Sequence, residues 1–186
     1  MRYLEVRRHS MRVKPSQSLS PAGIELARQV GRTIGPYDLV VTSKLTRAVE
    51  TAIEMGLTVS DRYAQLGILG DGVEDEIQWS KSFADFALLV RQGGPTARLA
   101  HDLAELWRSI ILTVPEGGQA LVIAHGGIIE AGAVACLTQA DYSDWGPICG
   151  YCEGVRLSFD GDTFAGVEVL RLQEYPEPPA PGHQVC

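Results

Sequence analysis

The sequence lacks long hydrophobic runs and a surplus of positive charge. No apolar stretch approaches the roughly 18 residues that a membrane-spanning helix requires, and the first residues contain no apolar core of a signal peptide. The net charge is −7 at pH 7, and this acidic balance disfavours a broad surface for nucleic acid or anionic membranes. We therefore expect a cytoplasmic protein with no nucleic-acid or membrane partner, in which a local cluster of positive groups must hold any bound anion.

Cysteines and metal-binding patterns are also scarce. The chain has four cysteines, too few for the disulfide framework of a small secreted domain. Cys149 and Cys152 form a single CxxC pair, and without a second pair for zinc or a thioredoxin-like context we interpret it as incidental spacing. The sequence contains no phosphate loop of the GxxxxGKS or GxxxxGKT type and no cluster of metal ligands. It therefore predicts neither a cofactor nor a metal ion.

Apolar strand patterns alternate with helical patterns along the chain. Of the 186 residues, 45% are hydrophobic and 21% are charged, as expected of one globular domain. We predict this domain over residues 1–175 and a Pro-rich tail over 176–186. The patterns predict strands over 3–7, 39–41, 57–59, 120–124, 155–159 and 167–172, and helices over 21–34, 45–53, 83–90, 99–111 and 128–136. This alternation predicts an α/β fold of three layers, with a mostly parallel central sheet and a small helical cap inserted within 57–118.

Three polar clusters follow directly after predicted strands. They are Arg8-His9, Ser43 to Arg47, and His125-Gly126. Ligands of such folds bind beyond the carboxyl ends of the parallel strands, so we expect the clusters to converge on one site. Arginine binds phosphate oxygens in a bidentate manner, helix N-termini donate N–H groups to anions, and glycine lets the backbone come close. The pattern indicates a phosphate pocket in which one histidine is a neutral nucleophile and the other a donor to developing charge.

The same residues resemble the motifs of the histidine phosphatase superfamily, in its phosphoglycerate mutase-like branch. Arg8-His9 resembles the RHG signature of that family, and Val122 to Gly127 resembles its second-histidine strand. Leu19 to Ala27 is similar to the LTxxGxxQA helix start, and Thr42 to Ala52 is similar to the SxxxRAxxTA segment. These motifs occur in the family's order and span residues 4 to about 130.

The resemblance implies a role for each of these residues. His9 attacks phosphorus and carries a phosphohistidine intermediate, while Arg8, Arg47 and His125 bind the phosphoryl oxygens with Gly126 beside them. A carboxylic acid protonates the leaving oxygen and then helps to activate water. Arginines and imidazolium supply the positive charge that magnesium supplies in other phosphoryl-transfer enzymes, so the resemblance implies no metal and no cofactor.

Several positions depart from the family's pattern. Ser10 replaces the glycine of RHG, where it can donate to phosphate but would be strained by a positive φ. Arg12 stands where the family often has threonine, serine or alanine, and is a further candidate contact to phosphate or substrate. Gln65 falls at or near the place of the family's acid, whereas counting from Arg47 points to an acidic loop. We choose Glu74 as the candidate general acid from this loop, which carries Asp71, Glu74, Asp75 and Glu76.

The leading hypothesis is a metal-independent phosphatase, a phosphoric monoester hydrolase. Its substrate is expected to be a phosphorylated small molecule or a phosphoprotein, including phosphohistidine in protein. Two alternatives stay open at this point. One is a phosphate-binding or interaction protein on the same fold with little turnover, and the other is a phosphoglycerate mutase, for which the chain is short. The sequence predicts no oligomeric state.

Overall fold

A six-stranded sheet forms the centre of the computed structural model, which describes residues 1–172. The strand order is β3-β2-β4-β1-β5-β6. The first four strands in this order run parallel to one another, and β5 is antiparallel to both of its neighbours. The bounds are β1 Arg2–Arg8, β2 Leu39–Ser43, β3 Asp61–Tyr63, β4 Gln119–Ala124, β5 Gly154–Asp160 and β6 Thr163–Leu170. The tail predicted over 176–186 lies outside the described residues.

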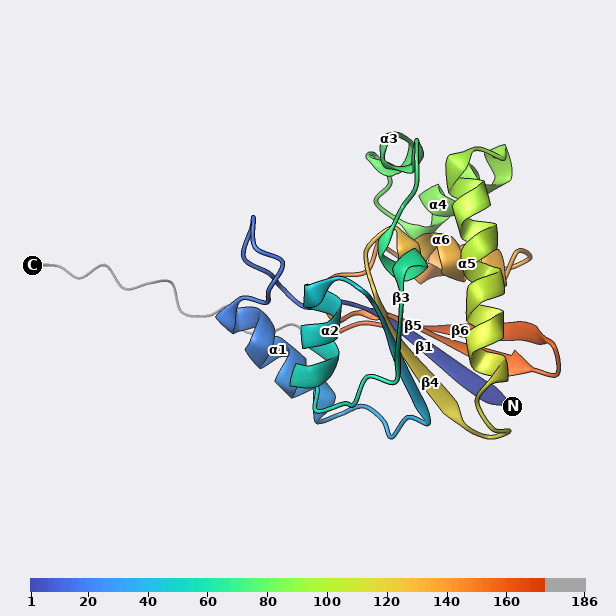
Figure 1. The fold of residues 1–186 in the computed structure, drawn as a ribbon. Coiled ribbons are helices and arrows are strands. Elements are labelled where there is room, and N and C mark those ends of the chain that lie inside the picture. Colours follow the sequence, from blue (N-terminus) through green and yellow to red (C-terminus); the bar gives the residue numbers. More distant parts are fainter. Residues whose placement is uncertain (173–186) are drawn as a thin grey trace, which may run out of the picture.

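Helices cover both faces of this sheet (Figure 1). One face carries α1 (Pro21–Gly31) and α2 (Thr46–Glu54). The other face carries α4 (Phe83–Gln92), α5 (Pro95–Leu112) and α6 (Ile128–Cys136). Three shorter elements connect these, namely α3 (Val73–Ile77) and the 3-10 turns η1 (Ala64–Gly67) and η2 (Ser143–Trp145). The predicted three-layer α/β fold with a mostly parallel sheet is confirmed.

The segment 57–118, where the sequence predicts a cap, contributes one strand to the sheet and several helices outside it. Strand β3 extends the sheet beside β2, and α5 packs against α6 in the helical layer. The stretch around α3 stands beyond the carboxyl ends of the strands (Figure 1). Within residues 1–172, no helix combines the length and the apolar character needed to cross a membrane.

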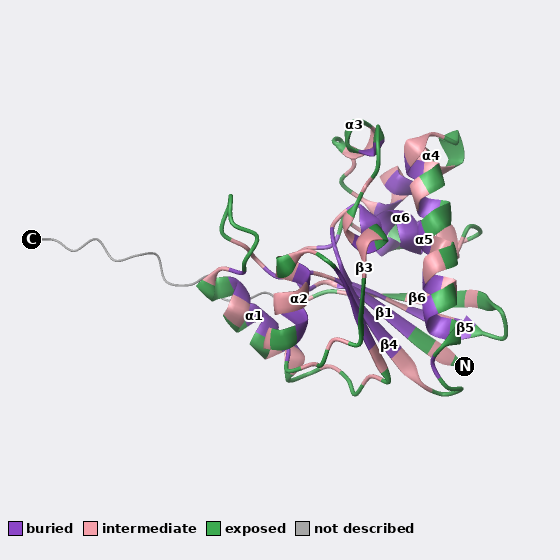
Figure 2. Ribbon diagram, in the orientation of Figure 1, coloured by how far each residue is buried: buried purple, intermediate pink, exposed green. Residues whose placement is uncertain are grey.

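Two hydrophobic clusters hold the helices on the sheet. The larger joins the sheet to α4, α5 and α6, and the smaller joins it to α1 and α2. Figure 2 shows the buried residues on the strands and on the sides of the helices that face them. Trp107 of α5 is fully buried, and Gly132 of α6 lies against its ring. A Cβ atom at Gly132 would lie 2.4 Å from ring atom Cη2, so the close approach of the two helices requires glycine here.

Most predicted elements are present, but three differ in their details. Ser20 and Ser43 each lie just before a helix, where serine is a common N-cap residue. Ser20 caps α1, because its hydroxyl accepts a hydrogen bond from the N–H of Gly23. Ser43 does not cap α2, which begins at Thr46 after Leu45. The strand predicted over 57–59 is wrong, because the chain pairs with β2 only at 61–63. The return strand predicted over 167–172 begins earlier and forms the hairpin over 163–170.

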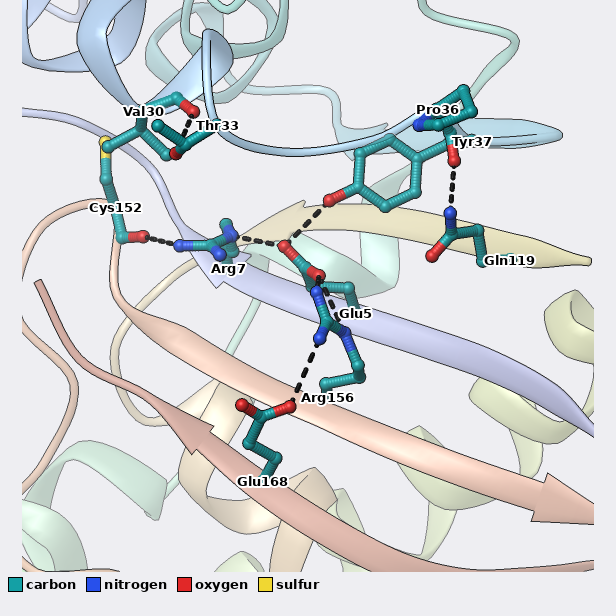
Figure 3. Close-up of polar contacts among 10 residues, drawn as sticks. All are labelled: Glu5, Arg7, Val30, Thr33, Pro36, Tyr37, Gln119, Cys152, Arg156 and Glu168. Atoms are coloured by element: carbon teal, nitrogen blue, oxygen red, sulfur yellow. Dashed lines mark hydrogen bonds and ion pairs between the residues drawn. The ribbon is translucent and has the colours of Figure 1, made fainter.

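A buried ionic network lies on the face of the sheet that α1 and α2 cover (Figure 3). Glu5 is 1% exposed, and its carboxylate accepts hydrogen bonds from Arg7, from the hydroxyl of Tyr37 and from Arg156. Arg7 also donates to the carbonyl of Cys152 at 2.7 Å. Each buried charge therefore has a partner, as burial in a low-dielectric interior requires. Arg7 is occupied in this network, whereas its neighbour Arg8 projects elsewhere.

Candidate active site

The three polar clusters meet where β1, β2 and β4 end. Because β1 pairs in parallel with β4, Arg8 is the register partner of Ala124, and the N–H of His9 donates to the Ala124 carbonyl at 3.0 Å. His9 and His125 thereby lie side by side, with ring centroids 4.9 Å apart. They border a cavity of about 450 Å³. Its lining includes Arg8, His9, Arg12, Lys14, Arg47, Glu74, His125, Gly126, Gly127 and Tyr151.

The two ring nitrogens of His9 have different partners. Nδ1 lies 2.6 Å from the carbonyl of Ser10, which can only accept, so Nδ1 carries the proton. Nε2 is then the nitrogen that carries the lone pair, and it accepts a hydrogen bond from Nε of Arg47 at 3.1 Å. Burial, reinforced by the charges of Arg47 and Arg8, lowers the pKa of His9 from 6.5 to about 4. The imidazole is therefore neutral near pH 7, with Nε2 as its nucleophilic atom.

The guanidinium group of Arg8 is held from several sides. It donates to the carbonyl of Cys149 at 2.8 Å, and its central carbon lies 4.7 Å from the centre of the Tyr151 ring. It also lies against Gly126, where a Cβ atom would come within 3.4 Å of it. Its Nε is buried and has no hydrogen-bond partner among the described residues. A buried donor of this kind, beside His9, is available to an anionic ligand.

His125 is positioned by a residue of the neighbouring strand. The hydroxyl of Ser43, at the end of β2, lies 2.7 Å from Nε2 of His125. Its Nδ1 is buried without a hydrogen-bond partner among residues 1–172. Burial and the positive charge around it lower the pKa of His125 to about 3, so this ring is neutral in the free protein. A bound dianion would favour its protonated form, because an opposite charge raises the pKa of a base.

Two residues that the sequence reasoning did not select support this site. Glu130 of α6 is fully buried, and its carboxylate accepts from the N–H groups of Gly127 and Cys149, at 2.7 and 2.8 Å. It therefore joins the loop after His125 to the loop that holds Arg8. Tyr151 lines the cavity, and its ring centroid is 5.8 Å from that of His9. A carboxylate within the apolar run IIEAGAVAC was the signal for Glu130, whereas nothing local marked Tyr151.

The fold and the sequence of the chain can be compared with those of known proteins. Neither a family model nor a curated protein sequence matches the chain. Solved structures do match it. A phosphoserine phosphatase from Entamoeba histolytica, in complex with 3-phosphoglyceric acid, is 18% identical, with a TM-score of 0.69 over 93% of this chain and 98% of its own. A mycobacterial glucosyl-3-phosphoglycerate phosphatase, in complex with VO3, is 22% identical, with a TM-score of 0.64 over 91% and 98%. YhfR from Bacillus stearothermophilus is 19% identical, with a TM-score of 0.64 over 89% and 95%.

The chain has the histidine phosphatase fold. The expected fold is therefore confirmed, and it spans nearly the whole chain. Within this fold the structure brings Arg8, His9, Arg47 and His125 to one cavity at the carboxyl edge of the sheet. Gly126 lies in its wall, against the guanidinium group of Arg8.

Ser10, the position that departs from the RHG signature, lies away from this cavity. Its backbone N–H donates to the hydroxyl of Thr51 at 2.9 Å, and its own hydroxyl donates to the carbonyl of Gly23 at 2.7 Å. Ser10 is fully buried and does not have a positive φ, so the strain that a serine could suffer here is absent. The expectation that Ser10 contacts phosphate is corrected, because its hydroxyl joins the segment that follows β1 to α1 instead.

The acidic loop provides one carboxylate to the cavity. Glu74 is exposed on α3 and is the carboxylate among the cavity-lining residues. Gln65 and Asp71 line a separate groove between η1 and α5, and Glu76 accepts from the N–H of Thr96. Arg12 also lines the cavity. The described residues contain no group of three or more His, Cys, Asp or Glu side chains that could hold a metal ion.

Proposed function

We propose that the chain is a phosphatase that hydrolyses phosphomonoesters through a phosphohistidine on His9. The observation that carries this proposal is the environment of His9. Its Nδ1–H donates to the Ser10 carbonyl, which places the lone pair on Nε2, where it accepts from Arg47, inside a cavity that Arg8, Arg47 and His125 also line. A neutral imidazole beside two guanidinium groups combines a nucleophile with a clamp for the phosphoryl oxygens.

The proposed reaction has two steps. In the first, Nε2 of His9 attacks phosphorus, the bond from phosphorus to the ester oxygen breaks, and Glu74 gives a proton to the leaving alcohol. In the second, the Glu74 carboxylate takes a proton from water as the water oxygen attacks phosphorus, and the bond from phosphorus to Nε2 breaks, which releases inorganic phosphate and neutral His9. Arg8, Arg47 and His125 offset the negative charge on the equatorial oxygens in both steps. Because these groups supply positive charge, the proposed mechanism includes no metal ion.

Arg47 must move for the reaction to start. Its Nε–H donates to the lone pair of His9 that has to attack phosphorus. A phosphoryl group provides stronger, charged acceptors, so binding of the substrate would transfer this hydrogen bond from His9 to a phosphoryl oxygen. The substrate thereby frees its own nucleophile.

Hydrolysis of p-nitrophenyl phosphate in the presence of EDTA tests the proposal. Wild-type protein should turn over under these conditions, and His9→Ala should lower kcat/KM by about 10³-fold or more. His101→Ala, which removes an exposed imidazole on α5, is the matched control. A phosphohistidine trapped by rapid quenching should be present in the wild type and absent from His9→Ala. Undiminished activity in His9→Ala, or loss of wild-type activity in EDTA, would contradict the proposal.

The hydrogen bond from Arg47 to His9 also favours a second candidate function, a phosphate-binding protein with little turnover. In that case the guanidinium group would keep the lone pair of His9 occupied while Arg8 and His125 hold the anion. Calorimetric binding of phosphate and vanadate, together with a panel of phosphomonoesters, separates the two candidates. Tight binding of both anions without release of phosphate from any ester would support the binding protein.

A further inference from the structure

Four fixed positive charges line the cavity that contains His9. They belong to Arg8, Arg12, Lys14 and Arg47, and the lining contributes Glu74 as the opposing carboxylate. This concentration occurs in a chain whose net charge is −7. Like charges gathered in a concave site repel one another and concentrate anions. The cavity therefore accommodates more negative charge than the two charges of a phosphomonoester group.

None of these four cations forms an ion pair with a carboxylate in residues 1–172. The ion pairs of the described chain involve other basic groups, such as Arg7 and Arg156 with Glu5, and Arg171 with Glu153. Arg12 instead donates to the carbonyl of Ser16 at 3.0 Å, which leaves its charge uncompensated. The charge of Arg12 also acts on Arg47, because burial together with the guanidinium groups of Arg12 and Arg8 lowers the pKa of Arg47.

The four cations occupy two parts of the cavity. Arg8 and Arg47 flank the proposed nucleophile His9, since Arg8 directly precedes it in the chain and Arg47 donates a hydrogen bond to it. Arg12 and Lys14 lie on the loop between β1 and α1, where Arg12 is half-buried and Lys14 is exposed. A backbone bridge between Arg12 and Leu19 closes this loop, and Glu50 of α2 accepts from the N–H of Leu19 at 2.7 Å. The second pair of cations is thus held at the cavity, on a loop anchored to α2.

We propose that Arg12 and Lys14 form a second anion subsite, and that the preferred substrate is a small phosphomonoester carrying another anionic group, a carboxylate or a second phosphate. The preference for such a substrate rests on the proposed function, whereas the binding of an anion at the subsite does not require turnover. The cavity of about 450 Å³ fits a small molecule of this kind. Arg8 and Arg47 hold the phosphoryl group that is cleaved, and the Arg12–Lys14 subsite holds the other end.

Binding of three phosphonates that cannot be hydrolysed tests the subsite directly. Propylphosphonate, 3-phosphonopropanoate and propane-1,3-bisphosphonate share a three-carbon chain that ends in a methyl group, a carboxylate or a second phosphonate. By calorimetry near pH 7.5 and about 0.15 M salt, the two compounds with a second anionic group should bind at least about 10-fold more tightly than propylphosphonate, a difference of about 1.4 kcal/mol. Which of the two binds more tightly distinguishes a carboxylate from a phosphate as the second group.

Charge-removing variants locate the preference within the cavity. Arg12→Gln and Lys14→Gln should each reduce the preference for the second anionic group at least about threefold, and the double variant should abolish most of it. Lys44→Gln is the matched control, because Lys44 is exposed at the end of β2 and does not line the cavity. It removes the same charge from the same edge of the sheet without touching the subsite.

Three outcomes would overturn the subsite. They are equal affinity for the three phosphonates, no binding of any of them, and a preference that Lys44→Gln reduces as much as Arg12→Gln or Lys14→Gln does. The last result would assign the preference to the general field of the protein. Failure of the proposed function has a different signature, because wild-type protein would then bind phosphonates with the expected preference but would release no phosphate from the corresponding esters.

Discussion

The two buried imidazoles should make the protein sensitive to mild acid. In the folded protein burial lowers the pKa of His9 to about 4 and that of His125 to about 3, against an ordinary value of 6.5. Between these values the unfolded chain binds protons that the folded chain does not, so the free energy of unfolding falls as the pH falls through this window. The loss begins near pH 6.5 and is complete for each histidine below its folded pKa.

The size of this loss follows from the same pKa values. Between about pH 7.5 and about pH 5, linkage gives a loss of about 2 kcal/mol for His9 and about 2 kcal/mol for His125. Together they make about 4 kcal/mol, a large fraction of the roughly 5–15 kcal/mol by which a typical domain is stable. Carboxylates contribute their own pH dependence, which a comparison between variants cancels.

Urea unfolding of wild type, His9→Gln, His125→Gln and the double variant at the two pH values measures this effect. The quantity of interest is the change in the free energy of unfolding between the two pH values, because each variant also changes the absolute stability. That change should shrink by about 2 kcal/mol in each single variant and by about 4 kcal/mol in the double variant. His101→Gln serves as the control for loss of an exposed imidazole. A double variant that loses as much stability as the wild type on acidification would refute the burial of two neutral rings.

Three further substitutions test the supports of the fold and the site. Glu130→Gln should leave one of its two buried N–H donors unpaired, which should lower the free energy of unfolding by about 1–3 kcal/mol in urea unfolding. It should also reduce kcat while the circular dichroism spectrum stays that of the folded wild type. Gly132→Ala should destabilise the protein by about 3 kcal/mol in urea unfolding, because the new methyl group overlaps the ring of Trp107. Glu5→Gln leaves the buried Arg7 without its counter-ion, and should cost about 3–5 kcal/mol in the same assay while kcat/KM of the folded fraction stays near that of the wild type.

Much of the site could be predicted because it follows from where strands end. Arg8-His9, Arg47 and His125 each follow an apolar strand. Parallel pairing places the carboxyl ends of these strands side by side, independently of the conformation of the connecting loops. The strand near residue 60 was misplaced because β3 is short and made of the polar residues Asp61 to Tyr63, which carry no apolar alternation.

The remaining errors concern contacts between residues far apart in the sequence. Serine just before a helix is typical of an N-cap residue. The hydroxyl of Ser43 instead lies against His125, which is 82 residues away in the sequence. Ser10 faces Gly23 for the same kind of reason. Glu130 occupies a helix that is apolar on all sides, and only the folded structure shows that two backbone N–H groups turn towards it. Local patterns contain no information on such partners.

The loop from Cys149 to Cys152 has a thermodynamic consequence for ligand binding. Its carbonyl groups hold Arg8 and Arg7, one at each end of the CxxC pair, and Glu130 fixes the N–H of Cys149. The rotamer freedom of the Arg8 guanidinium is therefore lost when the chain folds rather than when an anion arrives. Binding to a preorganised clamp avoids an ordering cost of about 0.5–1.5 kcal/mol for each such side chain. The entropy of anion binding should accordingly be less unfavourable than if the side chain of Arg8 rotated freely.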